Sequence, residues 1–274
     1  MPEGPEIWRT ADFLSDALQG EPVTNLYFAF DRLKEYETEL QGKKVEKVEA
    51  RGKAILTFFG NSHVMYSHNQ LYGKWMLSDN GEEPDTNRKL RVAIHNDRHS
   101  AYLYSASQIE MLERKEVSEH SYIKKLGPDV LHPDTSYEDV IGQFTADTFQ
   151  NRKLTTLLLD QGFVSGIGNY LRSEIMFYAG VDPHQKLRSY PDSEKEALAK
   201  ATIKLSERSY ERGGHTNDPS IIEALQRENA DKTDQRFFVY KRTGRRCHKC
   251  GAVIEEEKTG GRKIYYCPSC QIEE

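Results

Sequence analysis

The stretch CHKCGAVIEEEKTGGRKIYYCPSC, residues 247–270, contains all four cysteines of the 274-residue chain. Their pattern, C-x2-C-x16-C-x2-C, is typical of a zinc site in which two tight turns supply four thiolates. We therefore predict one structural zinc ion bound by Cys247, Cys250, Cys267 and Cys270. The alternatives are an iron centre with the same ligands and a pair of disulfides, which the cytosol disfavours. Four thiolates complete a tetrahedral shell, so His248 is expected to be a spacer and the ion to have no open position for catalysis.

The charge around these cysteines differs from that of the remaining chain. Residues 236–263 contain nine Lys or Arg and three Glu, a local charge of +6 in a chain whose net charge is −5. A net acidic chain with a pI near 6.0 argues mildly against nonspecific attraction to nucleic acid. The basic patch at its end is nevertheless the first indication of a polyanionic partner.

The composition is that of a globular protein, with 37% hydrophobic and 30% charged residues, and the length favours two domains. No apolar run approaches the 18 or more residues of a membrane-spanning helix. The acidic start of the chain lacks the basic and apolar regions of a signal peptide. We therefore expect a cytoplasmic protein with no membrane partner.

Hydrophobic periodicity divides the chain. Apolar residues at helical spacing between Ile7 and Leu18 predict a leading helix that Gly20 ends. Alternating runs then predict an antiparallel sandwich or barrel with strands at residues 23–30, 45–50, 54–59, 63–67, 90–95 and 101–104. Helical patterns follow at residues 137–144, 154–161, 170–178 and 193–211, then a polar, mobile loop at 213–235 and a β-hairpin around the metal. The chain is therefore predicted to be α+β and multidomain, with domains at residues 1–124, 125–236 and 237–272.

The first residues carry a candidate nucleophile. Removal of the initiator methionine would leave Pro2 with a free secondary amine, whose ordinary pKa of about 8 keeps part of it neutral. Such an amine can attack an aldehyde-like carbon and form an iminium, and Glu3 or Glu6 could transfer the protons. The alternative is that these residues merely begin a helix, where proline and glutamate are favoured.

Two further segments contain candidate anion-binding groups. A turn between two predicted strands could direct Lys53 at an anion or a reacting centre, although a lone lysine in a turn usually faces solvent. The glycine-rich segment SGIGN, residues 165–169, precedes a predicted helix, whose free N–H groups suit a phosphate. Asn169 could cap that helix or donate from its amide to a phosphate. The segment lacks the lysine and hydroxyl residues of a nucleotide-binding P-loop.

Five segments together resemble the Fpg/Nei DNA glycosylases, and most closely the endonuclease VIII branch of that family. They are MPEGPE (1–6), RGKA (51–54), SHNQLYG (67–73), LLLDQGFVSGIGNYLRSEI (157–175) and YYCPSCQ (265–271). The resemblance spans nearly the whole chain with the motifs in the same order. It implies an N-terminal β-sandwich, a helix–two-turn–helix domain and a C-terminal zinc finger.

The resemblance also implies a bifunctional DNA glycosylase and AP lyase of base excision repair. Such an enzyme excises oxidised pyrimidines through a Schiff base on the N-terminal proline and then cuts the strand by β,δ-elimination. Its partner is double-stranded DNA containing oxidised bases or abasic sites. The expected protein is a monomer in a bacterial cytoplasm, associated with the nucleoid.

Individual roles follow from the same resemblance. Pro2 would attack C1′, Glu3 would donate protons, Lys53 would assist β-elimination, and Arg262 would reach a phosphate and assist δ-elimination. The remaining implied site residues are the DNA contacts Gln70, Leu71, Tyr72, Lys125 and Asn169, and the supporting residues Glu6 and Glu174. Lys125 stands where the family often has arginine, so its phosphate contact lacks a bidentate fork.

Two other functions compete with this one. A noncatalytic zinc-finger DNA-binding relative would not need Pro2, Glu3 and Lys53 together. A formamidopyrimidine or 8-oxoguanine glycosylase of the same family would share the mechanism but carry a different set of intercalating residues. The segment 69–72 fits the endonuclease VIII pattern instead.

Overall fold

The computed structural model of the chain describes residues 2–79 and 81–272. Its internal contacts separate two compact units. Unit 1 contains Pro2 and Glu6–Lys125, and unit 2 contains Glu3–Pro5 and Leu126–Glu274. The three residues Glu3–Pro5 therefore belong to unit 2, although the residues on both sides of them belong to unit 1.

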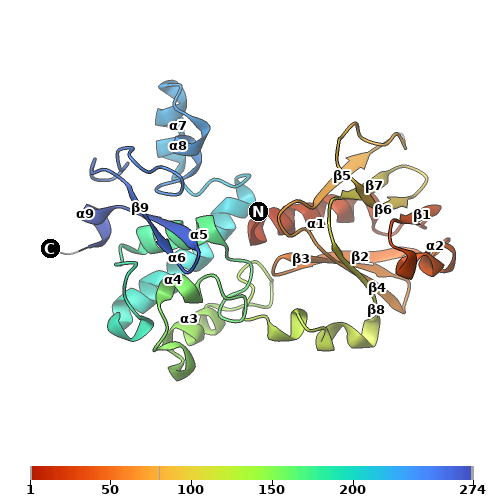
Figure 1. The fold of residues 1–274 in the computed structure, drawn as a ribbon, viewed down its shortest axis with the longest axis horizontal. Helices are drawn as coiled ribbons and strands as arrows, with labels where there is room; N and C mark the ends of the chain where they lie inside the picture. The colour runs from red at the N-terminus through yellow and green to blue at the C-terminus, as the bar shows by residue number, and fades with distance from the viewer. Residues whose placement is uncertain (1, 80, 273–274) are drawn as a thin grey trace. The chain divides into compact units, whose positions relative to one another are not determined.

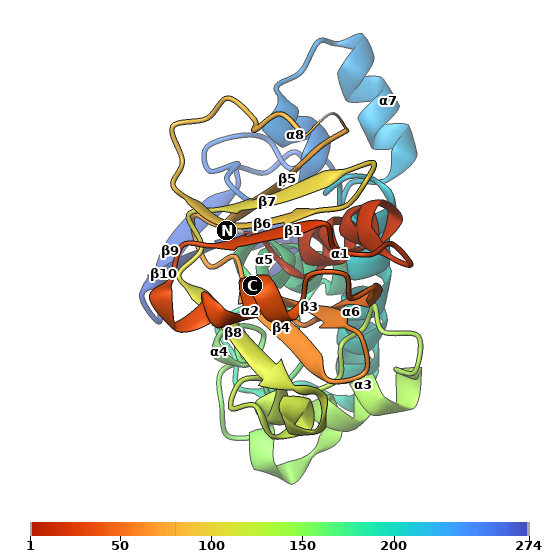
Figure 2. The same cartoon turned by 90° about the vertical axis from the view of Figure 1, so that its right-hand side faces the viewer.

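Unit 1 is a sandwich of two antiparallel four-stranded sheets with a leading helix, α1 (Gly4–Leu18) (Figures 1 and 2). One sheet has the order β1 (Asn25–Phe28), β6 (Leu90–His95), β7 (Ser100–Tyr104) and β5 (Lys74–Ser78). The other has the order β2 (Val45–Arg51), β3 (Ala54–Phe59), β4 (His63–His68) and β8 (Gln108–Glu113). Short helices lie at α2 (Glu35–Glu39), η1 (Asp31–Leu33), η2 (Arg114–Glu119) and η3 (Ile123–Lys125).

Strand β3 is buried on both faces. The turn between β2 and β3, which contains Lys53, therefore leads directly into a packed strand. Ile55 and Phe59 join the core shared with α1 and the other sheet. Leu56 and Phe58 point to the opposite face and belong to a second cluster, which residues of η2 and η3 cover. The run AILTFF therefore lacks the apolar–polar alternation of a half-exposed strand.

Unit 2 is helical and ends in a two-stranded hairpin. Its longest helices are α5 (Asn169–Ala179) and α6 (Asp192–Glu211), which pack through a core that also includes α3 (Tyr137–Thr145) and α4 (Leu154–Leu157). Strands β9 (Glu255–Thr259) and β10 (Arg262–Tyr266) form the hairpin, and α9 (Pro268–Gln271) follows it. Two single-turn helices, η4 (Asp147–Phe149) and η5 (Leu187–Ser189), complete the connections.

The α+β fold class predicted from the sequence is confirmed, and the structure adds elements that the periodicity missed. Strands β5 and β8 were not predicted, because their burial patterns mix buried and partly exposed residues without strict alternation. The helix expected at 154–161 ends at Leu157, and turns follow it. No helix among the described residues has both the length and the apolar character needed to cross a membrane.

Residues 213–235, expected to be a loop, contain two helices instead. Helix α7 (Pro219–Arg227) has proline in its first turn, and α8 (Lys232–Arg236) begins where the Asp231 side chain accepts from the Thr233 N–H. The three apolar residues Ile221, Ile222 and Leu225 have the i, i+1, i+4 spacing that gives α7 an apolar side. Because residues 213–235 have few apolar residues overall, this short helical pattern was not recognised in the sequence.

Candidate active site and nucleic-acid interface

The carboxylate of Glu3 lies at the N-terminus of α5 and accepts three backbone N–H groups. Its Oε1 atom accepts from Tyr170 N at 2.8 Å, and Oε2 accepts from Gly168 N at 2.9 Å and Leu171 N at 3.2 Å. The first N–H groups of a helix have no partner within the helix, and its positive dipole end favours an anion. Glu3 therefore caps a helix that begins 165 residues further along the chain.

Two glycines permit this close approach. A Cβ at Gly168 would lie 2.4 Å from Cδ of Glu3, a distance that no real contact allows. A Cβ at Gly4 would lie 3.0 Å from Cα of Gly166, and the Gly4 N–H donates to the Gly166 carbonyl at 2.7 Å. Gly166 itself has a φ of +86°, which glycine adopts without strain. Gly166 and Gly168 of the SGIGN segment thus contact Gly4 and Glu3, the residues that follow Pro2.

Asn169 has a different role from the cap considered for it. Gly168 is the N-cap residue of α5, with no side-chain capping bond, and Asn169 is the first helical residue. The Asn169 amide donates to the Lys263 carbonyl at 3.0 Å and accepts from Arg172 at 2.7 Å. Arg172 also donates to the Lys263 carbonyl, at 2.9 Å. The start of α5 is thereby tied to strand β10, directly beside the exposed residue Arg262.

Glu174, on the same helix, is fully buried. Its carboxylate accepts from the hydroxyl of Thr216 and from the backbone N–H groups of Phe238, Val239 and Tyr240. Burial raises the pKa of Glu174, and these four donors oppose that effect. Glu174 therefore fixes the backbone that leads into the zinc-binding segment, a supporting contact within unit 2.

In unit 1, Lys53 and Gln70 are connected by one network. The backbone N–H of Lys53 donates to the Tyr122 hydroxyl at 2.9 Å, and the Tyr122 ring meets the His68 ring edge-to-face at 5.5 Å. Nδ1 of His68 accepts the backbone N–H of Gln70 at 2.9 Å. Burial, together with the charge of Lys53, lowers the pKa of His68 to about 4. The ring is thus neutral near pH 7, and Nδ1 is free to accept.

The residues after Gln70 place two large apolar side chains on an exposed turn. Gln70 has a φ of +50°, a strained value that the bond to His68 supports. Leu71 and Tyr72 are 52% and 68% exposed, although most of the chain's large apolar side chains are buried. An exposed leucine and tyrosine on a fixed turn indicate a binding surface.

The remaining predicted site residues occupy separate places. Pro2 is half-buried and groups with unit 1, whereas Glu3 groups with unit 2. Glu6 forms an ion pair with Arg9 at 3.3 Å on α1. Lys125 is exposed at the end of η3.

The four cysteines form a site that fits zinc. Their sulfur atoms all lie within 4.8 Å of one another, with Cys247–Cys270 at 3.9 Å and Cys250–Cys267 at 3.4 Å. Ligands on a tetrahedron with Zn–S bonds of about 2.3 Å lie about 3.8 Å apart. Nε2 of His248 instead faces the Asp234 carbonyl at 3.2 Å. The prediction that the histidine is a spacer agrees with this geometry.

Sequence reasoning missed several residues that hold the site together. Arg172 and His68 both lie inside the quoted motifs, but nothing in their local pattern indicates that one ties α5 to β10 and the other supports Gln70. Tyr122 and Thr216 lie in segments of no recognisable motif and act through contacts distant in the sequence. The only available signal was the glycine pair in SGIGN, whose spacing marks a close backbone approach.

Comparison with known proteins agrees with this geometry. The formamidopyrimidine-DNA glycosylase N-terminal domain matches residues 1–107, its H2TH domain matches 126–220, and the zinc finger found in FPG and IleRS matches 244–272. Endonuclease 8 from Klebsiella pneumoniae is 42% identical over 271 residues, covering 99% of this chain and 100% of its own. Endonuclease 8 from Escherichia coli O9:H4 matches with the same identity and coverage. The chain belongs to the Fpg/Nei family.

Solved structures show the same fold. A Lactococcus lactis FPG mutant in complex with Fapy-dG-containing DNA superposes with a TM-score of 0.82 at 22% identity, covering 99% of this chain and all of the other. The L. lactis enzyme bound to DNA with an abasic site gives a TM-score of 0.80 at 21% identity, with the same coverage. This membership confirms the predicted β-sandwich, helix–two-turn–helix and zinc-finger architecture. It also confirms a base excision repair DNA glycosylase with AP lyase activity, and one structural zinc ion.

Proposed function

We propose that this Fpg/Nei enzyme excises oxidised pyrimidines from double-stranded DNA and cuts the resulting abasic site by β,δ-elimination, with the amine of Pro2 as nucleophile. The observation that carries the proposal is the Glu3 carboxylate, held by three N–H groups directly beside that amine in the chain. The 42% identity to Endonuclease 8 over the whole chain supports the pyrimidine-specific branch.

The first chemical steps use the amine and the carboxylate together. The Pro2 nitrogen attacks C1′ while the bond from C1′ to the base breaks, and the base leaves with that electron pair and takes a proton from water. The ammonium proton of Pro2 passes to the Glu3 carboxylate, which gives it to O4′ as the C1′–O4′ bond opens. An iminium then joins Pro2 and C1′. Because the helix N-terminus stabilises the anion, Glu3 enters the reaction as a proton acceptor before it becomes a donor.

The elimination steps involve the cationic residues. Removal of a C2′ proton expels the phosphate from C3′, and removal of a C4′ proton then expels the phosphate from C5′. Water then hydrolyses the iminium and frees the amine. Lys53 assists the first elimination. Arg262 and Asn169 bind a phosphate, a role that suits their position at the junction of β10 and α5.

The DNA must be opened for this chemistry. Extruding a damaged base from the stack costs a few kcal/mol. Gln70, Leu71 and Tyr72 fill the vacated space, and the exposure of the last two supports this role. Lys125 adds a phosphate contact, while Glu6 and Glu174 support the site. Because one chain supplies all these residues, we propose a monomer that acts on bacterial chromosomal DNA in the cytoplasm.

Borohydride trapping on duplexes that each carry one defined lesion tests the proposal. Thymine glycol and dihydrouracil should give a covalent protein–DNA adduct and a faster single-turnover excision rate than 8-oxoguanine opposite cytosine. The reverse order of rates would assign the chain to the formamidopyrimidine branch. Strand binding without any trapped adduct would make it a noncatalytic relative.

A further inference from the structure

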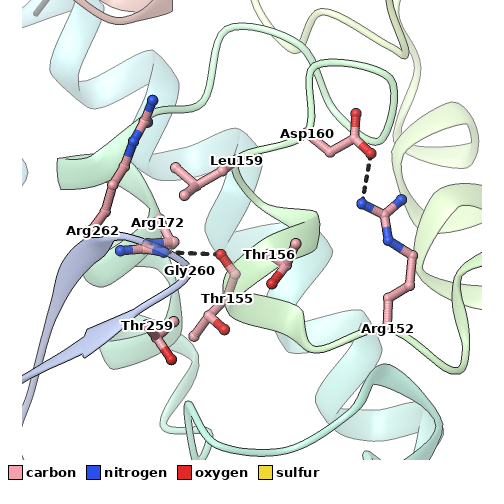
Figure 3. Close-up of a pocket in the computed structure, with 9 residues that line it drawn as sticks. All are labelled: Arg152, Thr155, Thr156, Leu159, Asp160, Arg172, Thr259, Gly260 and Arg262. Carbon is pink, nitrogen blue, oxygen red and sulfur yellow. Dashed lines mark hydrogen bonds and ion pairs between the residues drawn. The ribbon is translucent and has the colours of Figure 1, made fainter.

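Unit 2 contains a hollow of ≈ 320 Å³ between α4, the first turn of α5 and the β9–β10 turn (Figure 3). Of the residues assigned to the reaction, its lining includes only Arg262. Its lining includes the charged and hydroxyl side chains of Arg152, Thr155, Asp160, Arg172, Thr259 and Arg262. We call this hollow the arginine pocket.

The pocket contains a buried cation, Arg172, one nitrogen of which has no acceptor. Arg172 is fully buried, and its guanidinium donates to the carbonyls of Thr155 (3.0 Å) and Lys263 (2.9 Å). No salt bridge among residues 2–79 and 81–272 includes Arg172, and its Nε atom has no hydrogen-bond acceptor. Burial, together with the nearby charge of Arg262, lowers the pKa of Arg172 to about 10, and the charge of Glu3 opposes this shift. A buried donor that lacks an acceptor is costly, so an acceptor placed at Nε would stabilise Arg172.

A buried hydroxyl in the same wall also lacks a partner. Thr155 is 1% exposed, and its Oγ1 atom has no hydrogen-bond partner in the described structure. Thr155 and Arg172 are neighbours, because the Arg172 guanidinium donates to the Thr155 carbonyl (Figure 3). Leaving a buried hydroxyl unpaired costs about 1–3 kcal/mol, so an acceptor at either of these two donors would stabilise the protein.

The charges that line the pocket indicate that the expected ligand is an anion. Three arginines line it against one acidic residue, Asp160, which pairs with Arg152 at 2.8 Å. Arg172 and Arg262 are therefore not neutralised by the carboxylate. Guanidinium and hydroxyl donors together match a tetrahedral oxyanion, which offers several acceptor oxygens. A cation is excluded by the same charges.

We infer that the arginine pocket binds a phosphate group, which accepts from Nε of Arg172 and Oγ1 of Thr155. Both atoms are closed off from solvent, so the exposed turn at Gly260 must shift slightly to admit the anion. The phosphate is either a backbone phosphate of the bound strand or a free phosphate. The first source rests on the proposed function, and the second does not.

Thr155→Val tests the inference because it removes the hydroxyl at nearly constant volume. Inorganic phosphate at 20 mM, compared with sodium chloride of equal ionic strength, should raise the Tm of the wild-type protein by about 2–4 °C if its Kd is about 1 mM. The shift should be lost in Thr155→Val and retained in Thr155→Ser. Without phosphate, Thr155→Val should be at least as stable as wild type, since it removes an unpaired group.

The matched control is Thr148→Val, an exposed threonine outside the pocket, which should leave the phosphate shift unchanged. Binding of a duplex with an uncleavable abasic analogue, in phosphate-free buffer, distinguishes the two sources. A threefold to tenfold weaker binding by Thr155→Val assigns the phosphate to the DNA strand, and unchanged binding assigns it to free phosphate. No phosphate-specific shift in wild type, or an equal shift in Thr155→Val, overturns the inference. If wild type fails to bind or cleave DNA but keeps the phosphate shift, the proposed function fails and the pocket stands.

Discussion

Replacing Gly168 by alanine would test the carboxylate site through a single methyl group. The new Cβ would lie 2.4 Å from Cδ and 2.5 Å from Oε1 of Glu3. The φ of −130° at Gly168 is open to alanine, so the backbone is not strained. The carboxylate must instead withdraw from the helix N-terminus by about 1 Å to reach an ordinary contact distance.

The size of the effect follows from that displacement. Withdrawal breaks the hydrogen bonds from the N–H groups of Gly168, Tyr170 and Leu171. A misplacement of about 1 Å at a reacting group costs about 100-fold in rate, or about 2.7 kcal/mol. Losing hydrogen bonds to a buried charged group also destabilises the fold, by about 1–3 kcal/mol. We therefore expect excision to fall at least 100-fold while the protein stays folded.

Single-turnover excision of thymine glycol, measured at saturating enzyme, reports the chemical step without product release. Gly142→Ala is the control, because it lies in α3 and a Cβ there meets nothing within 4 Å. That substitution should raise stability by up to about 1 kcal/mol through helix propensity and leave the rate unchanged. A Gly168→Ala enzyme with the wild-type rate and Tm would refute the argument that Glu3 must occupy the helix N-terminus.

Three further predictions concern the metal, a titrating contact and the nucleophile. Cys247→Ser should lose zinc and DNA binding together; full zinc content by elemental analysis would contradict the four-thiolate site. Burial opposes protonation of His184, but its hydrogen bonds to Asp182 and Glu257 raise its pKa. Its stabilising contribution should be complete below the unfolded pKa of about 6.5 and lost as the pH rises through the folded value; an unfolding free energy whose pH dependence is identical in Glu257→Gln would disprove it. Blocking Pro2 with a retained initiator methionine should abolish borohydride trapping, and an adduct of undiminished yield would assign the nucleophile to another amine.

The sequence predicted elements whose pattern is local and strong. Strands β3 and β6 were placed with their observed limits, because β3 is a compact run of mostly apolar residues and β6 has Leu90, Val92 and Ile94 at alternate positions. Strand β8 was missed because its burial depends on the partner strand β4, which periodicity alone does not reveal. Helix α7 was missed because its neighbouring residues are polar. Tertiary context therefore decided the cases in which the local pattern was weak.

The sequence motifs indicated which residues belong to the candidate site, but they did not indicate which of these residues contact one another. Glu3 and the segment SGIGN were both singled out, yet nothing in either segment indicates that the carboxylate caps the helix that SGIGN begins. The two segments are separated by more than 160 residues, and such a pairing has no periodic signature. The same holds for His68, whose bond to the Gln70 N–H is local but depends on the left-handed backbone at Gln70.

The anchoring of Glu3 answers a physical difficulty of the proposed chemistry. A nucleophile that is the terminal amine of a chain has only one covalent attachment, and chain ends ordinarily fray. Here three backbone N–H groups donate to the Glu3 carboxylate, and the Gly4 N–H donates to the Gly166 carbonyl, so both residues after Pro2 are held in place. The amine keeps its freedom to react while its neighbours are fixed to the N-terminus of α5. Glycine at 4, 166 and 168 is then a requirement of the nucleophile's position, and a side chain at 168 should disturb the reaction more than it disturbs the fold.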